Sequence, residues 1–284
     1  MGEYISQFVS YLKERNLSPH TIKVYNSNLI EFWEFIGRKE SSVKAIKREE
    51  IRTFLFSLTE KNNQPITRRA KLTTLRSFFR YLEDENIIKY NPTKNLPSPR
   101  VAMKEPIYLS EGEIRKLLQT VQKDKNKRGE VAIRILVETG FRLSELTNLS
   151  VGDIDTQGKT IRVRRKGNRE QIVPINTGLS KLIRCFVKKK DAETPIIANR
   201  VGARMTQRRV AIMVGSYLKK AKVDRAGISV HSFRHSFCVR LLQKKVNLKT
   251  IQMLCNHSSI ATTEKYLHIA NPELRAGMKM AEVL

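Results

Sequence analysis

The hydrophobic residues of the first ninety positions recur at helical spacing. After the breaker Ser18-Pro19, the segment 21–36 carries apolar and aromatic side chains on one face, and Gly37 then ends the pattern. Two more amphipathic segments follow at 47–59 and 65–85. The pattern therefore predicts an all-helical domain over residues 1–90.

The second part of the chain mixes helical spacing with short alternating runs. Ser110 and Glu113 have the spacing of a capping box, which predicts that a helix begins there. Two of the short runs flank Lys166-Gly167-Asn168, which is typical of a hairpin turn. Helices are predicted from Ser110, over 128–138, from Ser144, over 179–190 and over 207–222, and strands over 150–154, 160–165 and 171–175. The predicted fold class is mainly α with a small antiparallel β-sheet.

A proline-rich segment separates the two parts. Four of the nine prolines lie between residues 91 and 106, with basic residues among them. We interpret 91–106 as a linker and 107–284 as the second domain, with a tail helix at 272–284 after Asn271-Pro272. The linker is either a basic segment that follows a DNA duplex or an ordinary surface connection.

The charge points to a polyanionic partner. The chain has 54 Lys and Arg against 27 Asp and Glu, a formal net charge of +27, and residues 101–284 carry 36 of these bases against 16 acids. Nucleic acid is the expected partner of such a chain. The three cysteines lack paired spacing, and no long apolar or signal-like segment occurs. We expect a reduced cytoplasmic protein without membrane segments.

The predicted helix at 65–85 has a second, polar stripe. Arg69, Thr73, Arg76 and Arg80 follow one another at helical spacing, and no acidic residue occurs from Lys61 to Arg80. A solvated face is one interpretation. The other, which we favour, is a helix that lies against DNA.

The segment 230–269 concentrates reactive side chains, including four of the five histidines. If HSFRHSFCVRLLQKK is helical, His231 and Arg234 lie one turn apart on the same side. A guanidinium grips phosphate oxygens, an imidazole moves protons near neutral pH, and the nearby Tyr266 is a possible nucleophile. This combination suits a phosphodiester substrate.

Two further cations lie in predicted turns. Arg142 falls between two helices, where it either serves the site or forms a structural ion pair with Glu145 or Asp153. Lys166 at the hairpin tip either reaches a neighbouring site or is solvated.

The motifs TGFRLSEL, RRKGNREQIVPI, HSFRH, NHSSIATT and KYLHI stand in an order that resembles the tyrosine recombinase (phage integrase) family. The resemblance implies an N-terminal helical core-binding domain and an α+β catalytic domain. Because it lacks an extra N-terminal domain and has a short tail, the chain is most similar to Xer-type site-specific recombinases. The alternatives are an integrase of a mobile element, a type IB topoisomerase and a non-catalytic DNA-binding relative.

The resemblance also implies roles for individual residues. Arg142 and Arg234 would hold the scissile phosphate, Lys166 would protonate the departing 5′ oxygen, His231 would assist proton transfer at Tyr266, His257 would hydrogen-bond the phosphate, and Tyr266 would form a 3′-phosphotyrosyl bond. Neither a metal nor another cofactor is implied. The implied partners are double-stranded DNA and further copies of the chain, as a tetramer on two DNA sites that resolves chromosome dimers.

The chain departs from the family pattern at a few positions. Cys255-Asn256 stands where Leu-Gly is usual before the second histidine, and asparagine tolerates the left-handed conformation that glycine would adopt. Cys238 replaces a common alanine. His235 is interpreted as structural. A zinc site built from His231, His235, Cys238, Cys255 and His257 is the rival interpretation of the same residue types.

Overall fold

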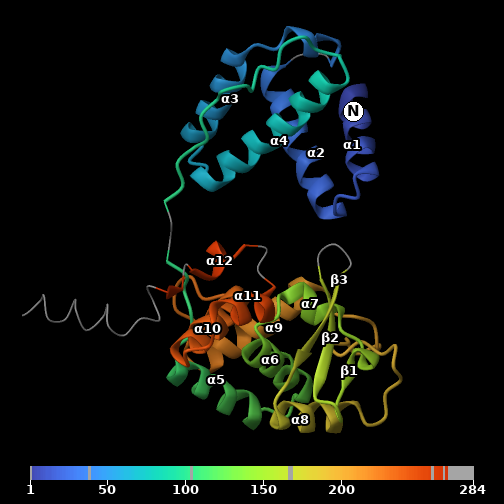
Figure 1. The fold of residues 1–284 in the computed structure, drawn as a ribbon, viewed down its shortest axis with the longest axis vertical. Helices are drawn as coiled ribbons and strands as arrows, with labels where there is room; N and C mark the ends of the chain where they lie inside the picture. The colour runs from blue at the N-terminus through green and yellow to red at the C-terminus, as the bar shows by residue number, and fades with distance from the viewer. Residues whose placement is uncertain are drawn as a thin grey trace, which may run out of the picture. The chain divides into compact units, whose positions relative to one another are not determined.

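The computed structural model describes residues 2–37, 40–102, 105–165, 169–256, 259–264, 266 and 267. The chain forms two compact units, Met1–Met103 and Lys104–Leu284 (Figure 1). Both are mainly helical, and a small antiparallel sheet lies in the second. This confirms the predicted fold class. None of the helices in the described ranges is long and apolar enough to cross a membrane.

The first unit is built from helices, as predicted. They are α1 (Glu3–Glu14), α2 (Pro19–Ile36), the short 3-10 helix η1 (Glu40–Ala45), α3 (Arg48–Glu60) and α4 (Pro65–Asp84). Helix α4 packs against α2 and α3 and buries Leu72, Leu75, Phe78 and Phe79. Ser18 caps α2 by accepting from the Thr21 amide, and the left-handed Gly37 ends it, as the breaker residues indicated.

The packed part of the first unit extends beyond residue 90. Leu96 is 4% exposed and joins the core of this unit. Arg48 donates to the Asn95 carbonyl, and Arg76 donates to the Leu96 carbonyl and, at 2.9 Å, to Ser98 Oγ. The first half of the expected linker is thus held on α3 and α4 by hydrogen bonds to its backbone.

The second unit surrounds one central helix. Its helices are α5 (Glu111–Lys123), α6 (Lys127–Thr139), α7 (Leu143–Asn148), α8 (Thr177–Val187), α9 (Gln207–Lys220), α10 (Val230–Gln243), α11 (Leu248–Cys255) and α12 (Ala261–Glu264). Helix α6 is buried along most of its length and packs against α5, α8 and α10. The helices predicted in this unit agree with these bounds to within a few residues. The predicted tail helix at 272–284 lies outside the described residues.

The sheet has the order β1-β2-β3, with β1 at Ile154–Asp155, β2 at Thr160–Arg165 and β3 at Arg169–Pro174. The β2–β3 pairing is antiparallel and runs from Thr160 opposite Pro174 to Arg165 opposite Arg169, which confirms the predicted hairpin. Ile161, Val163 and Val173 face the core, and their neighbours along each strand are more exposed. This alternation is the pattern that identified the strands.

The strand predicted at 150–154 is largely wrong. Val151–Asp153 form a 3-10 turn, and only Ile154 and Asp155 pair with β2. The Ser150 amide donates to Asp153 Oδ2 at 2.9 Å, and the Gly152 amide donates to the Ala192 carbonyl at 2.8 Å. These bonds use the amides that a longer strand would need for pairing.

Candidate active site

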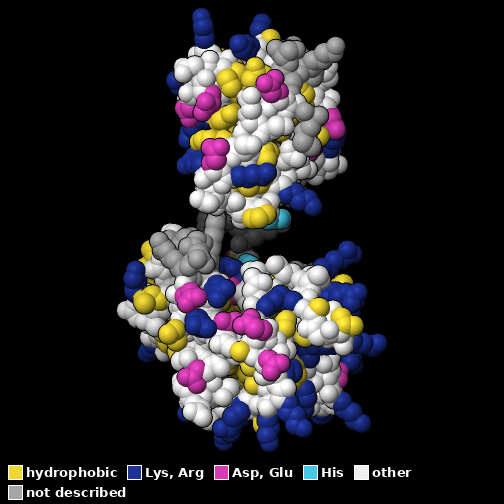
Figure 2. Space-filling model, turned by 90° about the vertical axis from the view of Figure 1, so that its right-hand side faces the viewer, with side chains coloured by type: hydrophobic (Ala, Val, Ile, Leu, Met, Phe, Trp, Pro, Cys, Tyr) yellow, Lys and Arg dark blue, Asp and Glu magenta, His cyan; other side chains and the backbone are white. Residues whose placement is uncertain are grey.

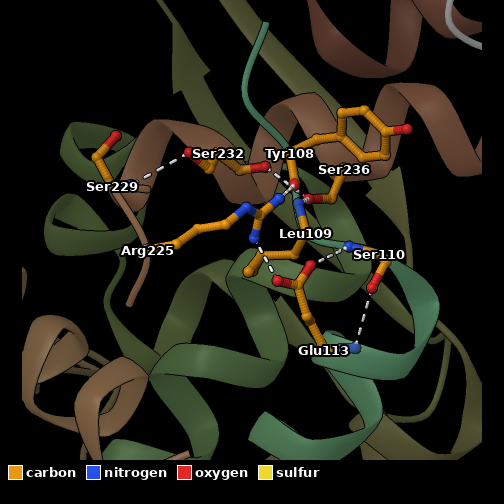
Figure 3. A network of polar contacts seen from close by, with 8 residues as sticks. All are labelled: Tyr108, Leu109, Ser110, Glu113, Arg225, Ser229, Ser232 and Ser236. Atoms are coloured by element: carbon orange, nitrogen blue, oxygen red, sulfur yellow. Dashed lines mark hydrogen bonds and ion pairs between the residues drawn. The ribbon is translucent and has the colours of Figure 1, made fainter. Parts of the chain in front are cut away.

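Serine side chains fix the beginning of helix α10, which carries the HSFRH motif. The Ser229 amide donates to Ser232 Oγ at 3.1 Å at the start of the helix. One turn later, Ser236 Oγ accepts from the Leu109 amide at 2.7 Å and donates to the Ser232 carbonyl at 2.7 Å (Figure 3). The extended segment before α5 is therefore hydrogen-bonded to α10 in the buried interior.

Arg225 strengthens the same attachment. Its guanidinium pairs with Glu113 and donates to the Tyr108 carbonyl at 2.7 Å (Figure 3). Glu113 also accepts from the Ser110 amide at 2.7 Å and so completes the predicted capping box of α5. These contacts connect α5, the loop after α9 and α10, and give the HSFRH motif a rigid support.

Arg234 is buried beneath the site. Its side chain lies on the same side of α10 as His231 and His235 because the three positions fall within about one helical turn. Only 3% of the residue is exposed. Nη1 donates to the Gly140 carbonyl at 3.0 Å, whereas the buried Nη2 has no hydrogen-bond partner among the described residues. A buried guanidinium donor without an acceptor is costly, and an anion would satisfy it.

Gly140 is required where it stands. It ends α6 in the left-handed conformation, with φ of 64°, and a Cβ there would lie 2.6 Å from Phe237 Cδ1. Its carbonyl is the one that Arg234 contacts. The Thr139-Gly140 break, which is apparent in the sequence, thus positions one arginine as well as ending a helix.

Arg142 follows two residues later, at the start of α7, and is partly exposed. Its Nη1 lies 2.8 Å from Glu145 Oε1, and its amide donates to Glu145 Oε2 at 2.9 Å. Its Nη2 donates to the Asn256 carbonyl at 3.2 Å. The ion pair to Glu145, which the sequence offered as a structural alternative, is therefore present, and it fixes a guanidinium that still reaches the site.

Asn256 adopts the conformation expected of it. With φ of 45° and ψ of 56°, it ends α11 in the left-handed region. The substitution of asparagine for the family's usual glycine keeps the turn. The Asn256 carbonyl then faces Arg142 and connects two segments that are 114 residues apart in the sequence.

Tyr266 lies in a small apolar cluster and is 3% exposed. The cluster comprises Phe237, Cys238, Val239, Ile251, Cys255 and Tyr266. The tyrosine hydroxyl lies 2.7 Å from Nδ1 of His235, and the ring of His235 in turn contacts that of His231, with centroids 5.5 Å apart. His235, expected to be structural, therefore touches the candidate nucleophile. The sequence signal that could have revealed it is its spacing of four residues from His231.

The electrostatics of the site favour the neutral forms of His231 and His235. Burial, followed by the positive charges of Arg234 and Arg142, lowers the pKa of His231. Burial, His231 and Arg234 together lower the pKa of His235 to about 4. Burial raises the pKa of Tyr266 well above its usual range. At neutral pH the tyrosine is protonated beside an imidazole that can accept a hydrogen bond.

Two of the predicted site residues, Lys166 and His257, lie outside the described residues. The strands that flank Lys166 are in place. Gln171 on β3 donates to the Met253 carbonyl at 3.0 Å, which attaches the hairpin to the last turn of α11. The structure therefore brings together Arg142, His231, Arg234 and Tyr266, and the roles of the other two residues stay predictions.

The residues of the polar stripe on α4 differ in their exposure. Arg76 is half-buried and bound to the Leu96 carbonyl, whereas Arg80 at the end of the stripe is exposed, as are Arg69 and Thr73. Basic side chains occur on both units over the face in Figure 2, with acidic side chains among them. DNA binding by this stripe stays a prediction, and Arg76 has in addition a structural contact with the segment after α4.

The rival zinc interpretation gains no support from the described part of the site. No group of three or more His, Cys, Asp or Glu side chains there is arranged to hold a metal ion. The Sγ atoms of Cys238 and Cys255 are 3.1 Å apart as free, buried thiols.

Comparisons with known proteins give the family. Residues 108–273 match the phage integrase family, and residues 5–86 match the phage integrase N-terminal SAM-like domain. Tyrosine recombinase XerC of Staphylococcus haemolyticus is 32% identical to this chain over 97% of it and 95% of the relative.

Two solved structures share the fold. XerH site-specific recombinase bound to a palindromic difH substrate covers 94% of this chain and 82% of its own, with a TM-score of 0.79 and 24% identity. The match to a lambda integrase dimer bound to a core site covers 91% of this chain and 95% of the integrase chain, with a TM-score of 0.73 and 18% identity. The chain therefore belongs to the phage integrase family of tyrosine recombinases, enzymes that cut and rejoin DNA strands at specific sites, and within that family it is of the Xer type.

Proposed function

We propose that Tyr266 is the nucleophile of this recombinase. Its hydroxyl attacks the scissile phosphate of a double-stranded DNA site, forms a 3′-phosphotyrosyl ester and releases a 5′-hydroxyl. The observation that carries this proposal is the hydrogen bond of the Tyr266 hydroxyl to a histidine whose helix also carries Arg234.

Arg142 and Arg234 would hold the non-bridging phosphate oxygens. The buried Nη2 of Arg234 has no acceptor among the described residues, and Arg142 is fixed in orientation by Glu145. Two preorganised guanidinium groups stabilise the negative charge that develops on a pentacovalent phosphorus. This positive charge supplies what metal ions supply in other phosphoryl-transfer enzymes.

The remaining roles come from the family resemblance. Lys166 would protonate the departing 5′ oxygen, and His257 would hydrogen-bond the phosphate. Because the tyrosyl ester conserves the energy of the broken phosphodiester, the 5′-hydroxyl of another strand can reverse the step, and strand exchange needs no ATP.

The exposed residues of the α4 stripe, Arg69, Thr73 and Arg80, would contact the DNA of the target site. Recombination joins two such sites, so we propose that four copies of the chain assemble on two duplexes. XerH and lambda integrase were both solved on DNA, the latter as a dimer on its core site. The resemblance to Xer-type recombinases favours resolution of chromosome dimers in the cytoplasm, and integration of a mobile element is the alternative.

The test begins by selecting a target from fragmented genomic DNA by its binding to the full chain. A duplex that carries this target, nicked so that the cleaved strand diffuses away, should form a denaturation-resistant adduct with the wild-type protein. Tyr266→Phe should bind the duplex and form none. An adduct with Tyr266→Phe would show that another residue is the nucleophile.

A further inference from the structure

Two buried cysteines of the second unit meet between neighbouring helices. Cys238 lies on α10, Cys255 is the last residue of α11, and the two helices pack against each other (Figure 1). Both cysteines are fully buried, and their Sγ atoms are 3.1 Å apart. A disulfide bond is about 2.05 Å long, so the sulfurs need to approach by only about 1 Å to form one.

Both cysteines stand at departures from the family pattern. The family commonly has alanine at the position of Cys238 and leucine at the position of Cys255. Either thiol alone would be a modest change in an apolar core. The two departures are 17 positions apart in the sequence and come into contact in the fold. Together they make a reaction available that alanine and leucine cannot undergo.

The pair adjoins the elements that carry the candidate site. Cys238 follows Arg234 by about one turn of α10. Cys255 directly precedes Asn256, whose carbonyl accepts a hydrogen bond from Arg142. The proposed nucleophile lies in the same apolar cluster as the two thiols. A displacement of the sulfurs would therefore be passed to the backbone beside both arginines.

We propose that Cys238 and Cys255 form a reversible disulfide bond, and that this bond slows DNA cleavage by the chain. The bond would join α10 to α11 and draw the two sulfurs together by about 1 Å. A misplacement of about 1 Å in a positioning group can lower a rate on the order of 10². The effect on cleavage rests on the site proposed above, whereas formation of the bond does not.

The oxidant is a hydroperoxide, with hydrogen peroxide as the simplest case. One Sγ, after losing its proton, attacks a peroxide oxygen, the O–O bond breaks, and a sulfenic acid and one water result. The second Sγ attacks this sulfur, the S–O bond breaks, and a second water leaves as the S–S bond forms. The two thiols together lose two electrons and two protons, which the peroxide takes up. A dithiol reduces the bond again by thiol–disulfide exchange.

The packed pair should react slowly. The hydrogen bond to Cys255, followed by burial, raises the pKa of Cys238, and the thiolate is the reactive form. Peroxide would reach the sulfurs when α11 loosens. This helix has only eight residues and carries the exposed Met253, and a helix this short is held mainly by its packing. We therefore expect the pair to stay reduced in a reducing compartment and to oxidise when peroxide persists.

Peptide mapping tests formation of the bond without reference to activity. The full-length protein carries Cys185→Ser, which removes the exposed thiol and with it cross-links between copies. After treatment with hydrogen peroxide and alkylation of the remaining thiols, it is digested with trypsin in the absence of reductant. Cys238 and Cys255 lie in different tryptic peptides, 235–240 and 250–265. We expect the two peptides to be cross-linked and to separate after dithiol treatment. Their recovery only as separate species before that treatment would overturn the proposal.

Single-turnover cleavage of the nicked target duplex tests the effect of the bond. The oxidised protein should cleave at least about tenfold more slowly than the reduced one, and a dithiol should restore the rate. The control is the double variant Cys238→Ala with Cys255→Leu in the same background, which carries the family's residues. Each protein is compared with its own untreated rate. An unchanged rate in the cross-linked protein, or equal slowing of the double variant by peroxide, would overturn the regulatory role.

Tyr266→Phe separates this proposal from that of the nucleophile. This variant should form no adduct with DNA, yet it should still yield the cross-linked peptides, because the disulfide does not involve the phenol hydroxyl. Loss of the cross-link in Tyr266→Phe would contradict a bond that depends only on the two thiols. Adduct formation by Tyr266→Phe would count against the nucleophile and leave the disulfide standing.

Discussion

Glu145 holds Arg142 at both its backbone and its side chain. Its Oε2 accepts from the Arg142 amide at 2.9 Å, and its Oε1 lies 2.8 Å from Nη1 of the same residue. The carboxylate is buried, with 6% of its side chain exposed, whereas 37% of the Arg142 side chain is exposed. Glu145 thus connects the start of helix α7 to the orientation of the guanidinium that we propose binds the phosphate.

Glu145→Gln should lower the cleavage rate more than the DNA affinity. The amide can keep the bond to the Arg142 backbone, but it loses the charge that orients the guanidinium. Misplacement of a positioning group by about 1 Å can cost on the order of 10² in rate. Single-turnover cleavage and equilibrium binding of the same duplex measure the two effects. Equal losses in rate and affinity would show that Glu145 acts on binding instead.

Arg234→Lys should slow cleavage by about 10² or more despite keeping the charge. A lysine cannot contact the Gly140 carbonyl and a phosphate oxygen with the planar geometry of a guanidinium. Arg240→Lys is the matched control, since Arg240 is a partly buried arginine on the same helix that contacts the Val137 carbonyl. The control should change thermal stability without a comparable loss of cleavage rate. Equal losses of rate in the two variants would contradict a direct role of Arg234 at the phosphate.

Gly140→Ala should destabilise the second unit more than Gly37→Ala destabilises the first. Both glycines have positive φ, which costs an alanine about 1–2 kcal/mol. Of the two, only Gly140 would bring the new Cβ against another side chain, Phe237, at 2.6 Å, which adds roughly 1–3 kcal/mol of overpacking. Chemical unfolding of each unit gives the comparison, and equal losses would show that the Phe237 ring moves aside freely.

Acidification should destabilise the wild-type protein more than His235→Asn. The pKa of His235 is about 4 in the folded chain against a usual value of 6.5, so the unfolded chain binds more protons between these values. Stability therefore falls as the pH drops from about 6.5 towards 4. His231 acts in the same direction in both proteins. Unfolding free energies at pH 7.5 and 5 should show a smaller decrease in the variant, and equal decreases would contradict the lowered pKa.

The exposed arginines of α4 should matter more for DNA affinity than Arg76. Arg69→Ala with Arg80→Ala should weaken binding and reduce the slope of log affinity against log salt by about 0.9 for each phosphate that the protein no longer neutralises. Arg76→Ala should mainly reduce the stability of the first unit, because it removes the bond to the Leu96 carbonyl. An unchanged salt slope in the double variant would show that this stripe is a solvated face.

Local patterns in the sequence predicted most of the helices and strands. Apolar spacing identified α4, and alternation identified β2 and β3, because both follow from residues a few positions apart. The strand at 150–154 was wrong because the Ser150 and Gly152 amides bond to a side chain and to a distant loop instead of a strand. The alternation of apolar and polar residues does not reveal such competing hydrogen-bond acceptors.

In the site, too, features that depend on nearby residues were predictable, whereas contacts between distant residues were not. Motif order singled out Arg142, Arg234 and Tyr266, which the structure brings together and whose roles stay predictions. The left-handed conformation of Asn256 was foreseen from its residue type. The contact of His235 with Tyr266 was missed, because it joins residues 31 positions apart that meet only when α10 and the end of the described chain pack together. The attachment of Leu96 to the first unit was missed because proline-rich composition hides a single buried side chain.

The most direct test of the nucleophile is to find the tyrosine that carries the DNA. After cleavage of the nicked duplex, the adduct is digested with nuclease and trypsin, and the modified peptide is sequenced by mass spectrometry. The chain has eight tyrosines, and Tyr266 is the only one in the tryptic peptide that spans residues 266–275. We expect the nucleotide on that peptide, and its recovery on any other peptide would contradict the assignment of Tyr266.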